Sequence, residues 1–182
     1  MSVRRVALTA LTAVTEEGAY ANLALKGAAA ALPKADAGLI SALVYETLDH
    51  LLTIDYYLSA LTSANKSALV RNVLRLGACQ LLYMHTPAHA AVNESVALCR
   101  EIGKAALSGY VNGVLRALQR QIADNALPPL PDAAAGRLSV QYSFPRWLVE
   151  KWIADYGETF AETLLAANPS GVTVRPQYPC AA

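Results

Sequence analysis

The chain has 182 residues, of which 54% are hydrophobic, and its formal net charge at pH 7 is +1. This length accommodates one full domain, or one domain and the beginning of a second. No apolar run reaches the roughly 20 residues that a helix needs to span a bilayer, and the N-terminus lacks the apolar core of a signal peptide. The three cysteines form no CxxC pair, which indicates reduced thiols and a cytoplasmic protein.

Four helices are predicted in the first 60 residues, each with an apolar stripe. Ser2 is the expected N-cap of the first helix. A second helix is expected over residues 22–31, where Pro33 ends it. Asp36 is expected to cap a third helix, and Thr53 a short fourth one. The spacing of apolar residues therefore predicts helix packed on helix in this part of the chain.

Two arginines, Arg4 and Arg5, lie in the first turn of the first predicted helix. The helix dipole favours carboxylates at this end, by about 0.3–1 kcal/mol, and disfavours cations. A terminus that frays tolerates any residue, which is the ordinary explanation. The other explanation is that these two arginines contact a phosphate. The pattern of the rest of the chain slightly favours this second explanation.

The stretch over residues 67–120 contains three further helical patterns, separated by short breaks. In each, an apolar stripe occupies one side, and cations and amides occupy another. In chain order these polar sides carry Arg71 and Arg75; then Asn93, Arg100 and Lys104; then Asn112, Arg116 and Arg120. Burial of the apolar stripes would leave the cationic sides for solvent or for an anion.

Charge is distributed unevenly along the chain. Residues 66–120 contain seven lysines or arginines and two glutamates, a net charge of +5, whereas residues 34–55 carry −3. A basic cluster that also carries amides suits a phosphate backbone. An ordinary solvated helix face explains the charge alone about equally well.

Two further patterns have simple explanations. His85 and His89 have the spacing of two metal ligands on a helix, but Pro87 lies between them, and no metal site is expected. Gly109 and Gly113 are also four residues apart, close to the predicted cationic face. Such glycines let helices pack tightly, which is the favoured interpretation, or let a phosphate or a partner's backbone approach.

The part after residue 125 differs in character. Prolines in residues 126–142 predict a stiff linker, and residues 143–182 are expected to begin a second domain. Pro145 near the first turn indicates a helix there, and another short helix follows over residues 159–167. Val172 to Arg175 have strand character but no partner strand. Cys180 lies in a Pro-Cys pair, and is not expected to be catalytic.

Several motifs together resemble a known family. They are Arg4-Arg5-Val-Ala-Leu, Arg75-Leu-Gly77-Ala-Cys-Gln-Leu-Leu-Tyr83, Pro87-Ala-His89-Ala-Ala-Val-Asn93-Glu-Ser-Val96, Asn112-Gly113-Val-Leu-Arg116 and Ser143-Phe-Pro145-Arg-Trp147. The chain resembles, over nearly its whole length, the NusB-like RNA-binding domain of the bacterial 16S ribosomal RNA cytosine-5 methyltransferases of the Sun type. The segment from Pro87 to Glu94 is the most specific part.

The resemblance implies an all-α bundle of about seven helices over residues 1–125 that binds ribosomal RNA. A linking domain and a catalytic domain would follow, in which a cysteine thiolate attacks C6 of cytosine and S-adenosylmethionine supplies the methyl group. That cofactor is expected for the full-length family member, and no site for it is expected in this chain. The predicted RNA-binding residues are Arg4, Arg5, Arg71, Arg75, Asn93, Arg100, Lys104, Asn112 and Arg116.

A second interpretation belongs to another functional class. The chain would then be a NusB-like antitermination adaptor that binds a ribosomal or transcription protein. The predicted acidic helix over residues 36–55 would suit a basic partner. The two amides, Asn93 and Asn112, bind RNA under the first interpretation, but caps or cross-links between helices are equally open for them.

Overall fold

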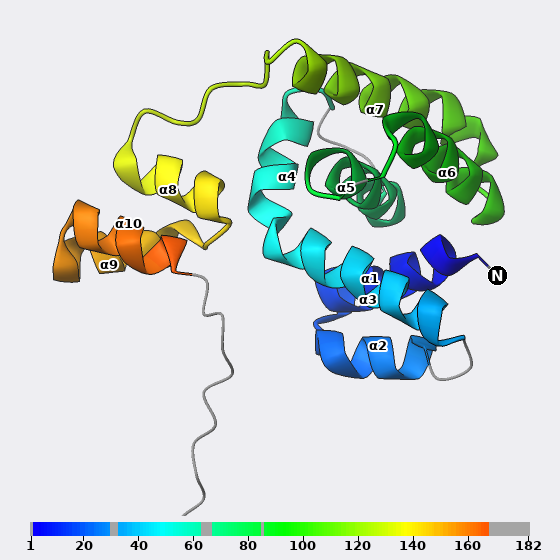
Figure 1. Ribbon diagram of the computed structural model, residues 1–182, viewed down its shortest axis with the longest axis horizontal. Helices are drawn as coiled ribbons and strands as arrows, with labels where there is room; N and C mark the ends of the chain where they lie inside the picture. Colours follow the sequence, from blue (N-terminus) through cyan, green and yellow to red (C-terminus); the bar gives the residue numbers. More distant parts are fainter. Residues whose placement is uncertain (1, 30–32, 63–66, 85, 168–182) are drawn as a thin grey trace, which may run out of the picture.

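The computed structural model describes residues 2–29, 33–62, 67–84 and 86–167, and the predicted all-α fold is confirmed there (Figure 1). These residues form ten α-helices and one 3-10 helix, with no strand. The elements are α1 (Val3–Glu17), α2 (Ala21–Ala29), α3 (Lys34–Asp49), α4 (Leu51–Ser59), α5 (Ala68–Leu82), α6 (Ala88–Glu101), η1 (Ala105–Leu107), α7 (Ser108–Ala123), α8 (Ala134–Tyr142), α9 (Arg146–Tyr156) and α10 (Glu158–Ala166).

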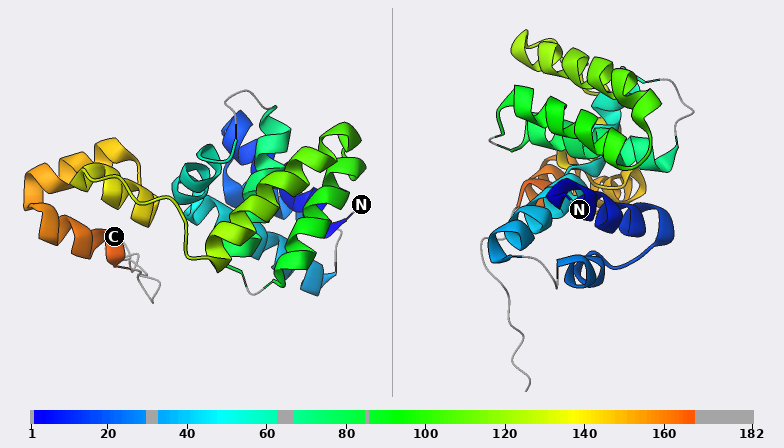
Figure 2. Two further views of the ribbon diagram at one scale, coloured as in Figure 1. Left: turned by 90° about the horizontal axis from the view of Figure 1, so that it is seen from above. Right: turned by 90° about the vertical axis from the view of Figure 1, so that its right-hand side faces the viewer.

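The helices form two units with separate cores. The first unit, α1–α7, has the seven helices that the sequence predicts, and its core is one continuous cluster of buried aliphatic side chains. The second unit, α8–α10, buries Leu138, Val149 and Leu165 in a much smaller core. Figure 2 shows the second unit beside α4, at the end of the first unit that is remote from the N-terminus. The second unit therefore has its own core and contacts the first unit where α8 meets α4.

Helix α5 lies at the centre of the first unit, in contact with α1, α3, α4, α6 and α7. Every residue from Asn72 to Gln80 is buried. Gly77 allows this crowding: a Cβ atom there would lie 2.6 Å from Leu115 Cδ1 and 2.7 Å from Ser95 Oγ. The absent side chain lets α6 and α7 approach α5 closely.

Because the middle of α5 is covered by its neighbours, Asn72 and Arg75 form a largely buried network with residues of α1 and α4. The Arg75 guanidinium donates to both carboxylate oxygens of Asp55, at 2.8 and 2.5 Å, and to Asn72 Oδ1 at 2.8 Å. The Asn72 amide donates in turn to the hydroxyls of Thr12 and Thr15, at 3.1 and 3.0 Å. The network joins α1, α4 and α5, and it satisfies polar groups that burial would otherwise leave unpaired.

This geometry corrects the expectation for Arg75. Helical periodicity places it opposite the apolar stripe, and the sequence analysis therefore predicts a solvent-facing cation. In the structure only 9% of the Arg75 side chain is exposed. The prediction is wrong because the polar side of a central helix is covered by neighbours as well.

Three helix boundaries also differ from the predicted ones. Helix α2 begins at Ala21, and α3 begins directly after Pro33, which occupies the N-cap position predicted for Asp36. Helix α4 begins at Leu51, before the predicted cap Thr53. The ring of Pro33 fixes its backbone φ angle at a value suited to the start of a helix. The prediction considered only side chains that cap a helix by hydrogen bonding.

Residues 134–142 form α8, although the sequence predicts a linker over residues 126–142. Of the predicted linker, only the part before Ala134 lies outside a helix. Helix α8 itself packs against α9 and α10. The three prolines all lie before the first residue of α8, so they do not interrupt this helix. The predicted strand from Val172 to Arg175 and the residue Cys180 lie outside the described residues.

Helices α3 and α4 meet at a bend of 70°, where the His50 ring stacks on the Tyr83 ring at 3.7 Å between centroids. No single helix in the described part of the chain is long and apolar enough to cross a membrane. Only this bent pair reaches that length and composition when its two helices are taken together.

Arg75→Ala should lower the free energy of unfolding by about 3 kcal/mol, because it leaves Asp55 and Asn72 without their buried partner. Arg71→Ala, four residues earlier on the same helix, is the matched control. The Arg71 side chain is 45% exposed, and its removal should cost less than about 1 kcal/mol. Urea denaturation followed by circular dichroism measures both values, and equal losses would contradict the buried network.

Gly77→Ala should also lower the free energy of unfolding, by at least about 1 kcal/mol, because overpacking at Leu115 and Ser95 outweighs the better helix propensity of alanine. Gly113→Ala is the control in α7, where an added Cβ meets no atom within 4 Å. That substitution should raise stability by about 0.5–1 kcal/mol. Opposite signs in thermal or urea unfolding are expected, and a stabilised Gly77→Ala protein would refute the close crossing.

Candidate nucleic-acid interface

The two arginines of the first helical turn join α1 to its neighbours. Arg4 donates to Gln80 Oε1 at 3.0 and 3.2 Å, and its guanidinium lies 3.3 Å from a carboxylate oxygen of Glu94. Arg5 donates to the backbone oxygen of Glu101 at 3.3 Å, and lies 3.9 Å from the same residue's carboxylate. Both cations are therefore partly neutralised by α6, and both have a structural role that the sequence analysis did not foresee.

Arg71 is exposed, but it also has a carboxylate partner. Its guanidinium donates to the two oxygens of Glu16 on α1, at 2.9 and 3.1 Å. This hydrogen bond is the main reason why the pKa of Glu16 is lowered below its ordinary value of 4.5. With Arg75 buried, neither predicted cation of α5 is left without an acidic partner.

Helices α6 and α7 differ from α1 and α5 in this respect. Arg100 and Lys104 are exposed at the end of α6 and just beyond it. On α7, Arg120 is exposed, and Arg116 donates only to Gln119 of its own helix, at 2.9 Å. Within the described residues no carboxylate lies within ion-pair distance of these four cations.

The two acids of α6 are engaged by α1, and the side chain of Asp124, the C-cap residue of α7, lies outside ion-pair distance of the described cations. Helix α7 has no acidic residue. The two acids of α6, Glu94 and Glu101, bind the N-terminal end of α1: Glu94 faces Arg4, and Glu101 accepts from the backbone and hydroxyl of Ser2. The ion pairs with α1 thus remove negative charge from the neighbourhood of α7.

We call the exposed sides of these two adjacent helices the α6–α7 face. Figures 1 and 2 place α7 across α5 from α2, at the edge of the first unit, where one of its sides meets no other helix. The face carries Asn93, Arg100, Lys104, Asn112, Arg116 and Arg120. Five of these six residues were predicted from the sequence. Arg120, one turn beyond Arg116, is not among the residues predicted to bind RNA.

Two glycines leave the exposed side of α7 flat. Gly109 and Gly113 are exposed, and a Cβ atom added to either would meet nothing within 4 Å. The interpretation that they serve tight packing between helices is therefore wrong for the described part of the chain. The exposed amide of Asn112 lies between them in sequence, so main chain and amide are both accessible beside the arginines.

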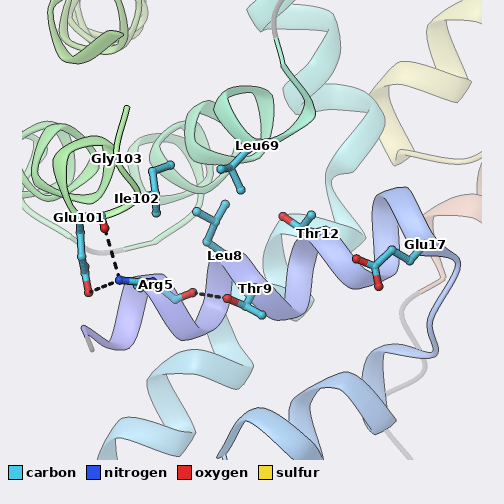
Figure 3. A pocket seen from close by; sticks show the side chains of 9 residues that line it. All are labelled: Arg5, Leu8, Thr9, Thr12, Glu17, Leu69, Glu101, Ile102 and Gly103. Carbon is cyan, nitrogen blue, oxygen red and sulfur yellow. Dashed lines mark hydrogen bonds and ion pairs between the residues drawn. The ribbon is translucent and has the colours of Figure 1, made fainter. Parts of the chain in front are cut away.

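A groove lies elsewhere, between α1, the start of α5 and the end of α6 (Figure 3). Its volume is about 400 Å³, and Leu8, Leu69 and Ile102 contribute apolar surface. Its charged lining is one arginine, Arg5, with the carboxylates of Glu17 and Glu101, and Arg5 is bound to Glu101. Net negative charge and an apolar floor make this groove unsuitable for a phosphate backbone.

The described thiols are not placed for nucleophilic chemistry. Burial raises the pKa of Cys79 to about 11 and raises the pKa of Cys99, so both are protonated at neutral pH. His85, one of the paired histidines, lies outside the described residues, and no group of three or more potential metal ligands occurs among the residues described.

The first unit is thus an all-helical bundle around a largely buried central helix, with basic residues that lack a described carboxylate partner on α6, on α7 and between them. The sequence pattern of the NusB family matches residues 1–120, and the chain belongs to this family. This confirms the resemblance that the motifs indicated.

Longer relatives extend the comparison to α8–α10. The chain is 35% identical, over 90% of its length, to the probable ribosomal RNA small subunit methyltransferase B of Bacillus subtilis. It is 32% identical, over 93% of its length, to a protein of the same description from Synechocystis. The chain covers only 37% and 40% of these two relatives.

The ion pair between Glu16 and Arg71 makes stability depend on pH. Because the pKa of Glu16 is lowered in the folded protein, its contribution is present above about pH 4.5 and is lost as pH falls through the folded value. Glu16→Gln should therefore be less stable than the parent at pH 7, and the difference should shrink below pH 4.5. Urea denaturation at pH 7, 5, 4 and 3 measures this difference.

Glu17→Gln is the control for that experiment, because it removes a neighbouring charge without breaking an ion pair described in the structure. It should change the free energy of unfolding at pH 7 much less. A Glu16→Gln deficit that is constant from pH 7 to pH 3 would show that the ion pair is not the source.

Proposed function

We propose that this chain is the RNA-binding part of an S-adenosylmethionine-dependent ribosomal RNA cytosine-C5 methyltransferase, and that it positions 16S ribosomal RNA in the bacterial cytoplasm. One observation carries the proposal: among the residues that the structure describes, the four cations of the α6–α7 face have no carboxylate partner, whereas every arginine of α1 and α5 has one. Lys26 on α2 is the other exposed cation without an ion pair among the described side chains.

Unpaired cations bind phosphate more strongly than cations already held by carboxylates, because no existing ion pair has to be broken. They also release condensed counterions from RNA, which gives a salt-dependent affinity. The amides of Asn93 and Asn112 can donate to phosphate or ribose oxygens, and the exposed glycines let a backbone approach α7. The names of the longer relatives support ribosomal RNA as the nucleic acid.

The described residues do not fit S-adenosylmethionine itself. A nucleotide-sized cofactor of this kind is expected to bind at the edge of an α/β sheet, and the described residues contain helices and loops but no strand. We therefore assign no cofactor contact and no methyl-transfer step to residues 2–167. The proposal places this chemistry in the portion of the longer relatives that the chain does not cover.

The structure gives the adaptor interpretation less support. It requires a free acidic surface on α3 and α4, but Asp55 is bound to Arg75, and Glu46 lies 3.5 Å from the His50 ring. The pair with Arg75 neutralises one of the four acids on which the interpretation rests, and the His50 ring lies beside a second. The apolar groove beside α1 remains the place that would suit a protein segment.

Arg116→Gln together with Arg120→Gln should weaken binding to 16S ribosomal RNA by tenfold or more at moderate salt. Each lost phosphate contact lowers the slope of log Kd against log salt by about 0.7–0.9, so the slope should fall by up to roughly 1.8. Fluorescence anisotropy across a salt series measures both quantities. Circular dichroism should show unchanged helicity, since neither side chain belongs to the buried core.

The matched control removes two cations from α9 instead. Arg146→Gln with Lys151→Gln changes the net charge equally, and both side chains are more than 60% exposed in pairs with Glu150 and Asp155. The control should bind RNA like the parent. If it weakens binding as much as the α7 pair does, general charge rather than the α6–α7 face is responsible, and the assignment is wrong.

A further inference from the structure

The contact between α4 and α8 contains two side-chain hydrogen bonds that each close the end of a helix. In the first, the Ser143 hydroxyl accepts from the backbone N–H of Leu52 at 3.0 Å. Leu52 is the second residue of α4, whose N-cap residue His50 supplies no side-chain cap. Ser143, 91 residues away in sequence, therefore provides the cap that a serine normally provides within its own helix.

The second bond runs in the opposite direction. The Thr53 hydroxyl donates to the backbone oxygen of Val140 at 2.5 Å. Val140 lies in the last turn of α8, where carbonyl groups lack a partner within the helix. Ser143 follows directly after α8 in the left-handed conformation, with φ of 58°. The two helices thus cap each other, and a further bond from the Tyr56 hydroxyl to the Pro129 oxygen lies alongside.

Both sides of this contact are anchored deeper in the molecule. On α4, Asp55 is held by Arg75 of the buried central helix. On α8, Arg137 lies 2.9 Å from Glu158 and 3.3 Å from Glu162, both on α10. A continuous set of polar contacts therefore runs from α5 through α4 and α8 to α10.

We propose that Ser143 and Thr53 are positioning residues, which hold the α8–α10 unit at a fixed orientation to the α6–α7 face. This inference rests on the proposed function, because the orientation matters for RNA bound at that face. Residues 126–133 alone would form a tether that allows many orientations. With the reciprocal caps, RNA held by α7 has one placement relative to α10.

Pulsed electron paramagnetic resonance on the full chain tests the joint without RNA. Spin labels at Ala42→Cys on α3 and Ala154→Cys on α9, both exposed positions, report the distance between the two units in a Cys180→Ser background. The parent should give one narrow distance distribution. Ser143→Gly with Thr53→Val should broaden it at least twofold, because glycine keeps the left-handed backbone and removes the hydroxymethyl group that forms the cap.

Three companion variants separate positioning from folding. Ser143→Asn should restore the narrow distribution, since asparagine tolerates this conformation and caps helices well. Each single substitution should give intermediate broadening. Thr9→Val removes a hydroxyl that bonds only within α1, and should change nothing. A narrow distribution in the folded double variant would overturn the proposal.

A second measurement links the joint to RNA. Iron-EDTA attached at Ala154→Cys cleaves nearby RNA by hydroxyl radicals, and the parent should cleave 16S ribosomal RNA at a focused set of positions. The double variant should bind with unchanged Kd but cleave over a spread of positions. Focused cleavage by the double variant would refute the positioning role. Absence of RNA binding by the parent would refute the proposed function alone, because the spin-label widths still test the joint.

Discussion

The burial of α5 from Asn72 to Gln80 is the constraint on which the rest of the structure depends. This part of the helix is covered by its helical neighbours, so Arg75 within it needs partners inside the protein. Asp55 and Asn72 provide them, and the same bonds fix α4 and α1 against the centre. Gly77 completes the arrangement, because only a residue without a side chain lets α6 and α7 cross at this distance.

The distribution of usable charge follows from that arrangement. Cations on α1 and α5 lie next to other helices and become partners for carboxylates, as Arg5 does with Glu101. Helix α7 lies at the edge and has one side without a neighbour, so Arg116 and Arg120 keep their charge for an external partner. Within the described part of residues 66–120, the cations without a carboxylate partner therefore lie on α6 and α7 and between them.

The second unit is likewise held by polar groups that find their partners on another helix. Its own core is small, and its orientation depends on polar groups at helix ends that have no partner in their own helix. Ser143 and Thr53 satisfy these groups across the joint, which links a stable bundle to a unit that would be marginal alone. Stiffness in this joint comes from directional hydrogen bonds, since little apolar area is buried in the second unit.

The sequence by itself determined the helical class, the seven helices of the first unit, the family, and the exposed side of α7. Periodicity succeeds for α7 because one side is buried and the other is free. It fails for Arg75, because an apolar stripe shows which side is most buried but not whether a neighbour covers the opposite side. Only the tertiary structure decided which cations are neutralised, because their acidic partners are distant in sequence: 55 residues separate Arg71 from Glu16, and 96 separate Arg5 from Glu101.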